Sequence, residues 1–313
     1  HAFGKLGVEL VVVDALDDLV AQDGFEIVGV GQRIDRELGA GVDNAEIILL
    51  DDAALDHLLE NISRLAREAE NAPSTALNDE LVAHGELMSS LLFVEVLRER
   101  DVEAQWFDAR KVICTDDTFG CAQPQVDAIA QRVESKLRPR LEQALVVTQG
   151  FIGSDTAGHT TTLGRGGSDY TASLLGEALQ AARVDIWTDV AGIYTTDPRV
   201  VPQAARIDKI SFSEASEMAT YGAKVLHPAT LLPAMRKNIP VFVGSSKKPA
   251  DGGTLVCSST DNPPCYRALA VRRKQTLLKL HSLNTRHPCH FLADMFAVLS
   301  RHHVDIDLMT TSE

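Results

Sequence analysis

Apolar residues recur along this chain with two periods. Residues 9–13 and 46–50 each consist of a glutamate followed by a short apolar run, and such runs are typical of buried strands. Between residues 52 and 71 leucine and isoleucine recur every three or four positions, and the pattern continues over residues 79–100. That spacing places the apolar side chains on one stripe and predicts two amphipathic helices.

Strand and helix patterns then alternate. The predicted strands cover residues 105–107, 145–150, 184–188 and 239–243, and the predicted helices cover residues 168–182, 213–220 and 230–237. Alternation of this kind predicts an α/β protein, an αβα sandwich with a mainly parallel central sheet.

A polar, proline-bearing segment at residues 258–266 follows and is typical of a linker. Beyond it, residues 276–280, 291–303 and 304–308 form a strand–helix–strand pattern. We therefore expect a larger domain over residues 1–257, in which the first 50 residues are atypical, the linker, and the start of a small module over residues 267–313.

Net charge and hydropathy restrict the partners. The chain carries a formal charge of −14, which repels nucleic acid and acidic membranes at long range. No apolar run approaches the roughly 20 residues that span a bilayer, and no apolar signal-peptide core opens the chain. We expect a cytoplasmic protein. Its five cysteines lack CxxC spacing and its histidines match no common metal site, so we predict reduced thiols and no metal-ligating cluster.

The segment most informative about chemistry is the loop at residues 164–169, Gly-Arg-Gly-Gly-Ser-Asp, which precedes a predicted helix. Glycines let backbone N–H groups approach an anion, and a helix N-terminus adds partial positive charge. Arg165 supplies a two-pronged partner for a carboxylate or phosphate. These features favour an anion site over a plain strand-to-helix connection.

Four segments in order resemble the motifs of aspartokinases, members of the amino-acid kinase family. They are His-Gly-Glu-Leu-Met-Ser at residues 84–89, Thr-Gln-Gly-Phe-Ile-Gly at 148–153 with the loop through Tyr170, Trp-Thr-Asp-Val-Ala-Gly-Ile-Tyr-Thr-Thr-Asp-Pro-Arg at 187–199, and Tyr-Gly-Ala-Lys-Val-Leu-His-Pro at 221–228. The resemblance is strongest to the monofunctional lysine-sensitive type. It implies the amino-acid kinase fold and an enzyme that forms 4-phospho-L-aspartate from MgATP and L-aspartate.

The resemblance assigns roles to individual residues. It implies that Glu86 binds the substrate ammonium, Arg165 the substrate α-carboxylate, and that Ser168 holds the same end of the pocket. Asp169 and Arg165 are the implied catalytic residues, since Asp169 would organise the cations. The residues implied to frame ATP are Thr188, Asp189, Tyr194, Arg199, Lys224 and Val225. Because the β-carboxylate of aspartate is already ionised at pH 7, catalysis would consist mainly of positioning and charge neutralisation by Mg²⁺ and basic groups.

The C-terminal pattern resembles the start of an ACT domain, a ferredoxin-like βαβ module that senses amino acids. The resemblance implies L-lysine as inhibitor, with Asp307, Thr311, Ser312 and Glu313 as effector-binding residues, and a homodimer through paired ACT domains in a full-length protein.

One expected motif is missing. Aspartokinases carry Lys-Phe-Gly-Gly-Thr-Ser after their first strand, and this chain does not contain it; Asp14, Asp17 and Asp18 follow the strand at residues 8–13 instead. Acidic residues there would repel ATP phosphates, so we expect impaired kinase activity. Two alternatives stay open: a catalytically inactive, lysine-binding regulatory homologue, and another amino-acid kinase, which the pairing of Glu86 with Arg165 disfavours because the pair suits an α-amino acid.

Overall fold

The computed structural model describes residues 11–12, 52–222, 226, 228–261, 264–271, 276–281, 288–302, 304, 306 and 309. The chain divides into two units, His1–Val271 and Arg272–Glu313. The predicted strand at 46–50 lies outside the described residues. None of the described helices is long and apolar enough to cross a membrane. All five cysteines are free thiols.

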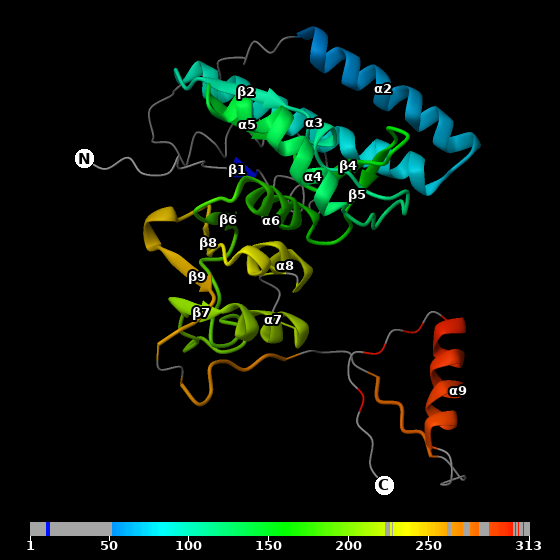
Figure 1. Cartoon of the computed structure of the whole chain (residues 1–313), viewed down its shortest axis with the longest axis vertical. Helices are drawn as coiled ribbons and strands as arrows, with labels where there is room; N and C mark the ends of the chain where they lie inside the picture. Colours follow the sequence, from blue (N-terminus) through cyan, green and yellow to red (C-terminus); the bar gives the residue numbers. More distant parts are fainter. Residues whose placement is uncertain are drawn as a thin grey trace. The chain divides into compact units, whose positions relative to one another are not determined.

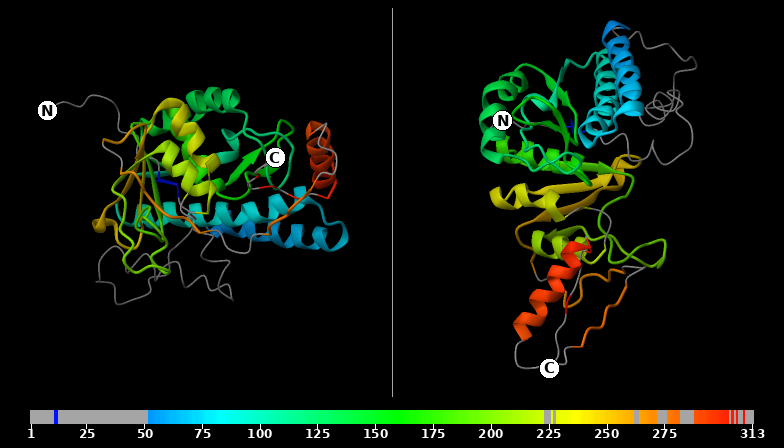
Figure 2. Two further views of the ribbon diagram at one scale, coloured as in Figure 1. Left: turned by 90° about the horizontal axis from the view of Figure 1, so that it is seen from below. Right: turned by 90° about the vertical axis from the view of Figure 1, so that its right-hand side faces the viewer.

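Two long helices follow β1 (Val11–Val12) among the described residues of the first unit. Helix α2 spans Asp52–Asn71, as its apolar stripe predicts, and lies alongside helix α3, Thr75–Glu99 (Figures 1 and 2). Helix α3 begins four residues before the predicted start because the Ser74 hydroxyl accepts a hydrogen bond from the Leu77 amide, which satisfies a free N–H group of the first turn.

The first sheet is wholly parallel. Its strand order is β1 (Val11–Val12), β3 (Leu145–Thr148), β2 (Ala104–Phe107), with Val147 of β3 opposite Val11 on one side and Trp106 on the other. A 3₁₀ turn, η1 (Ala109–Lys111), follows β2, and helices α4 (Val126–Arg132) and α5 (Arg138–Leu141) flank the π-helical turn η2, Val133–Leu137. The core beside this sheet joins Leu87 of α3, Val146 of β3 and Leu174 of the later helix α6.

A hairpin links β3 to α6 and was not predicted. Strands β4 (Ile152–Ser154) and β5 (Thr160–Thr162) pair antiparallel, and α6 (Gly167–Leu179) follows after a short glycine-rich turn. The three threonines of β5 are fully buried rather than alternating, so the segment lacks the period of an exposed strand.

The second sheet is mixed, in part unlike the predicted parallel arrangement. Its order is β6 (Val184–Thr188), β8 (Val241–Ser245), β9 (Gly253–Cys257), β7 (Lys209–Ser211). The outer pairs are parallel, but β8 and β9 run antiparallel because only the short turn η3, Pro249–Asp251, joins them. Helices α7 (Phe212–Thr220) and α8 (Pro228–Lys237) belong to this half, and a second core joins Val243, Ile210 and Leu231. The α/β class is confirmed.

The second unit holds helix α9, Pro288–Arg301, close to the predicted helix at 291–303. The predicted strand at 276–280 is wrong: these residues have no strand pairing, and Leu277 is 91% exposed. An apolar run forms a strand only where another strand satisfies its backbone, and no described residue pairs with this one. Val304 and Ile306 are likewise not in a strand, and residues 305, 307 and 308 lie outside the described residues. The ACT module stays a prediction.

Candidate functional site

The glycine-rich loop forms a tight turn at the N-terminus of α6. Gly164 and Gly166 have φ angles of +73° and +71°, a region that side chains disfavour, and Gly166 is the N-cap residue. The Gly167 amide donates to the Gly164 carbonyl at 3.0 Å, and the Tyr170 amide donates to the Gly166 carbonyl at 3.0 Å. Arg165 lies between the two glycines and is exposed. It is therefore close to the N-terminus of α6, the end at which the helix dipole is positive.

The carboxyl end of β3 packs directly on the first turn of α6. A Cβ atom added to Gly150 would lie 2.8 Å from Cα of Ser168, closer than real contacts allow. The Phe151 amide donates to the Thr171 hydroxyl at 3.0 Å, and the Leu163 amide donates to the Phe151 carbonyl at 2.9 Å. The segments 148–153 and 163–170, which belong to the same aspartokinase-like motif, therefore pack against each other.

Glu86 lies on α3, 4% exposed, among the helix residues that face the interior. Helix α3 contacts β5, and the turn that carries Arg165 starts directly after β5. Ser168 and Asp169 are half-buried in the first turn of α6, where an acidic side chain is stabilised by the helix dipole. The structure thus places the three predicted substrate-binding residues, Glu86, Arg165 and Ser168, on α3 and at the N-terminus of α6, where Asp169 also lies. Strand β5 packs on α3 and leads into the turn before α6.

The predicted nucleotide residues follow the carboxyl end of β6. Thr188 is the last residue of this strand, and its hydroxyl donates to the Asp189 carboxylate at 3.2 Å. The Thr188 carbonyl accepts from the amide of Ser246, just after β8. Tyr194 forms an isolated antiparallel bridge with Arg206. Carboxyl ends of parallel strands are where open α/β sheets bind ligands, and β3 and β6 both lead into candidate residues there.

Arg199 is exposed and held by one neighbour. Its guanidinium donates to both carboxylate oxygens of Asp197 at 3.0 Å, and its backbone amide also donates to that carboxylate. These hydrogen bonds to Asp197, together with the negative charge of that carboxylate, raise the pKa of Arg199 above its ordinary value. Lys224 and Val225 lie outside the described residues, as do the predicted effector residues Asp307, Thr311, Ser312 and Glu313.

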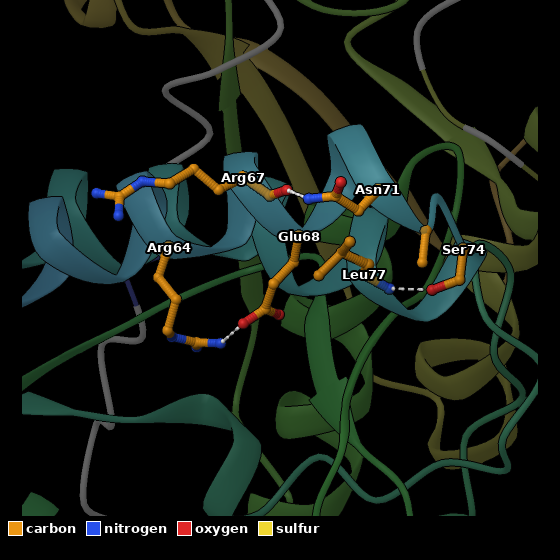
Figure 3. A pocket seen from close by; sticks show the side chains of 7 residues that line it. Arg64, Arg67, Glu68, Asn71, Ser74 and Leu77 are labelled. Atoms are coloured by element: carbon orange, nitrogen blue, oxygen red, sulfur yellow. Dashed lines mark hydrogen bonds and ion pairs between the residues drawn. The ribbon is translucent and has the colours of Figure 1, made fainter.

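Two surface hollows lie away from these candidate residues. One, of about 560 Å³, sits at the α2–α3 turn, where Arg64 pairs with Glu68 at 2.7 Å and Asn71 donates to the Arg67 carbonyl (Figure 3). Another, of about 550 Å³, is lined by residues that include Asp116, Asp155 and His159. No candidate site residue lines either hollow. Within the described ranges, no group of three or more His, Cys, Asp or Glu side chains could hold a metal ion.

Three buried polar residues beside the site were not predicted. Asp79 and Ser90 lie on α3 with Glu86, and Gln149 follows β3. They are 1%, 2% and 1% exposed. The spacing of Asp79, Glu86 and Ser90, seven and then four residues, is the one signal in the sequence that sets them on one helix face.

Comparison with known proteins identifies related chains. The amino acid kinase family matches residues 12–245. Lysine-sensitive aspartokinase 3 of Escherichia coli (strain K12) is 68% identical over 259 residues, covering 83% of this chain and 58% of that protein. The aspartokinase of Chlamydia pneumoniae is 39% identical over 232 residues, covering 73% of this chain and 52% of that protein.

The solved structures that this chain matches include aspartokinases. The crystal structure of E. coli aspartokinase III in complex with aspartate and ADP matches with a TM-score of 0.77 at 60% identity, covering 93% of this chain and 66% of that one. The complex of that enzyme with lysine and aspartate matches with a TM-score of 0.74 at 67% identity, covering 84% and 59%. The chain thus spans between half and two thirds of the length of these relatives.

Proposed function

Because the chain belongs to the amino acid kinase family and its close relatives there are aspartokinases, we propose that it transfers the γ-phosphate of ATP to the β-carboxylate of L-aspartate. A solved relative of this fold is in complex with aspartate and ADP, which supports both the substrate and the nucleotide. The product would be 4-phospho-L-aspartate, which supplies the aspartate pathway to lysine, threonine and methionine.

The observation that carries the proposal is a buried carboxylate on α3, a helix that contacts β5, the strand before the arginine-bearing turn at the α6 N-terminus. Glu86 on α3 is 4% exposed, and a desolvated carboxylate is a strong partner for an ammonium group. Arg165, in the turn before α6, suits the α-carboxylate, and Ser168 follows in the first helical turn. An α-amino acid needs both a cation-binding and an anion-binding group, so this pair favours aspartate over a nucleoside monophosphate.

Catalysis would then depend on placing two anions together. The β-carboxylate needs no general base, because it is ionised at pH 7. The protein has to orient it in line with the γ-phosphate and offset the repulsion. Arg165 would hold the substrate for this attack, and the nucleotide residues would be Thr188, Asp189, Tyr194, Arg199, Lys224 and Val225.

We propose Mg²⁺ as the metal bound with ATP. When bound, Mg²⁺ neutralises phosphate charge and needs only one or two protein carboxylates, because phosphates and water fill its other positions. Asp169, half-buried in the first turn of α6, would supply such a carboxylate. Asp169 would orient the metal–nucleotide complex, and Arg165 the aspartate.

The regulatory part of the proposal concerns residues 267–313. We propose that they begin an ACT domain after the linker at 258–266, and that L-lysine binds through Asp307, Thr311, Ser312 and Glu313. A related enzyme is described as lysine-sensitive, and its structure is in complex with lysine, which supports this assignment. Dimerisation through paired ACT domains belongs to the same proposal.

A hydroxamate assay tests the function. The chain is incubated with MgATP, hydroxylamine and either L-aspartate or N-acetyl-L-glutamate, and we expect aspartyl hydroxamate and ADP with L-aspartate alone. Turnover with the acetylated substrate instead would overturn the proposal. Turnover at the rate of an aspartokinase that carries Lys-Phe-Gly-Gly-Thr-Ser would refute the expected impairment. Calorimetry with ATP separates the inactive alternative, which predicts no nucleotide binding.

A further inference from the structure

We propose that Asp79 and the Ser90–Gln149 pair are positioning residues, which fix Glu86 on α3 relative to the turn that carries Arg165. The inference rests on the proposed function, in which Glu86 and Arg165 bind the two ends of the α-amino acid. These three residues would not touch the substrate. They would set the distance between the groups that do.

Asp79 joins α3 to the strand that leads into the turn. One carboxylate oxygen accepts from the Thr162 amide at 2.9 Å and from the Gly120 amide at 2.8 Å. The other accepts from the Thr162 hydroxyl at 3.0 Å. Thr162 is the last residue of β5, and Arg165 follows three positions later. A carboxylate that is 1% exposed and accepts three hydrogen bonds forms a strong and directional link, because charge-assisted bonds are about twice as strong as neutral ones.

Ser90 joins α3 to the end of β3. Its hydroxyl accepts from the Gln149 side-chain amide at 2.6 Å and from the Trp106 indole at 2.9 Å. The side-chain oxygen of Gln149, Oε1, accepts a hydrogen bond from the Ala109 backbone amide at 2.9 Å. Gln149 precedes Gly150, whose backbone lies against Ser168. This second link therefore ties α3 to the other segment that contacts the α6 N-terminus.

Glu86 lies between the two links. It follows Asp79 by seven residues and precedes Ser90 by four, so all three share one face of the helix. At 1.5 Å per residue the links are roughly 16 Å apart along the helix axis. Apolar packing is non-directional and tolerates small rotations and slides of a helix, whereas hydrogen bonds have narrow geometry. Two polar links on either side of Glu86 thus fix both the rotation and the register of α3.

The test compares two changes at Asp79 by calorimetry on the full chain. In Asp79→Asn the amide oxygen retains the two backbone N–H bonds, and we expect L-aspartate affinity within about threefold of wild type. In Asp79→Leu every acceptor is lost, and we expect L-aspartate to bind at least roughly tenfold more weakly. Binding of MgATP should be unchanged in both, which a general loss of structure would not produce.

The second link keeps the proposal testable if Asp79→Leu does not fold. Ser90→Ala removes the acceptor shared by Gln149 and Trp106, and we expect weaker L-aspartate binding without a change for MgATP. Ser173→Ala is the matched control, because this buried α6 hydroxyl has no hydrogen-bond partner in the described structure. Its L-aspartate affinity should equal that of wild type.

Three results would overturn the inference. A folded Asp79→Leu chain that binds L-aspartate as wild type does would show that the link positions nothing. Equal weakening for L-aspartate and MgATP would indicate a structural role only. If the wild-type chain binds no L-aspartate, the proposed function fails and this inference fails with it, whereas the first two results leave that function intact.

Discussion

The close approach of Gly150 to α6 makes one substitution especially informative. In Gly150→Ala the new methyl group would lie 2.8 Å from both Cα and Cβ of Ser168. Ordinary contacts begin at 3.4 Å, so the loop or the helix N-terminus must move by about 0.6 Å. One of the atoms that the new methyl group would overlap is the backbone Cα of Ser168, which cannot move aside by a change of rotamer. The change therefore displaces the first turn of α6, where Ser168 and Asp169 lie.

This displacement should change both the stability of the chain and its affinity for L-aspartate. Overpacking of this kind lowers the free energy of unfolding by about 1–3 kcal/mol. A displacement of 1 Å at a binding or catalytic group costs up to about a hundredfold, so a shift of half that size should weaken L-aspartate binding about tenfold, or about 1.4 kcal/mol.

The control is Gly158→Ala in the β4–β5 hairpin. Gly158 has a φ of +89° and no atom within 4 Å of an added Cβ. The change costs about 1 kcal/mol of backbone strain but produces no overlap. Urea unfolding and calorimetric titration with L-aspartate are measured for both variants. We expect both to be less stable than wild type, and only Gly150→Ala to bind more weakly. Unchanged L-aspartate affinity in Gly150→Ala would refute the argument that this contact shapes the site.

Three further predictions concern single side chains. Arg165→Ala should weaken L-aspartate binding by about 2 kcal/mol, or roughly thirtyfold. It should not lower the melting temperature, because the Arg165 side chain is exposed. Calorimetry and thermal unfolding measure the two effects, and unchanged affinity would contradict the prediction. Arg236→Leu should lower the free energy of unfolding, measured in urea, by about 1–2 kcal/mol, because the Glu177 carboxylate, 8% exposed, loses a guanidinium that donates to it at 2.7 and 3.2 Å. Water screens this ion pair in part, because the Arg236 side chain is half-exposed, so the loss is smaller than for a fully buried pair. Burial acts to raise the pKa of Glu214, but hydrogen bonds from Arg267 and Ser211 outweigh it and hold the pKa below its ordinary value. The stability that this carboxylate contributes is therefore present above the pKa of an unfolded-chain glutamate, about 4.3, and is lost as the pH falls through the lower folded-state pKa. Glu214→Gln should flatten acid unfolding in that range, and an unaltered pH profile would refute it.

Local patterns predicted the helices better than the strands. Helix α2 has the predicted bounds because leucines recur on one face, whereas α3 begins early because Ser74 caps it. The apolar run at 276–280 predicted a strand, but strand formation depends on a partner that a local pattern does not reveal. Strands β4 and β5 were missed because each has only three residues, all buried, so neither shows the alternation of buried and exposed positions.

The candidate site shows the same division. The turn at Gly164 and Gly166 was predicted because its glycines and helix start are consecutive in the sequence. The partners of Asp79 were not, because Thr162 is 83 residues away. Gln149 and Ser90 are 59 residues apart in the sequence, and nothing in the sequence around either one indicates that they form a hydrogen bond with each other. Contacts of this range depend on how the elements pack.

The central claim is that Glu86 and Arg165 together recognise a free α-amino acid. It is tested most directly by calorimetric titration of the full chain with L-aspartate and with N-acetyl-L-aspartate, which lacks the ammonium group. We predict saturable binding of L-aspartate that Glu86→Gln and Arg165→Ala each weaken at least about tenfold, and no measurable binding of the acetylated compound. Equal binding of both compounds, or L-aspartate affinity unaffected by either substitution, would contradict it.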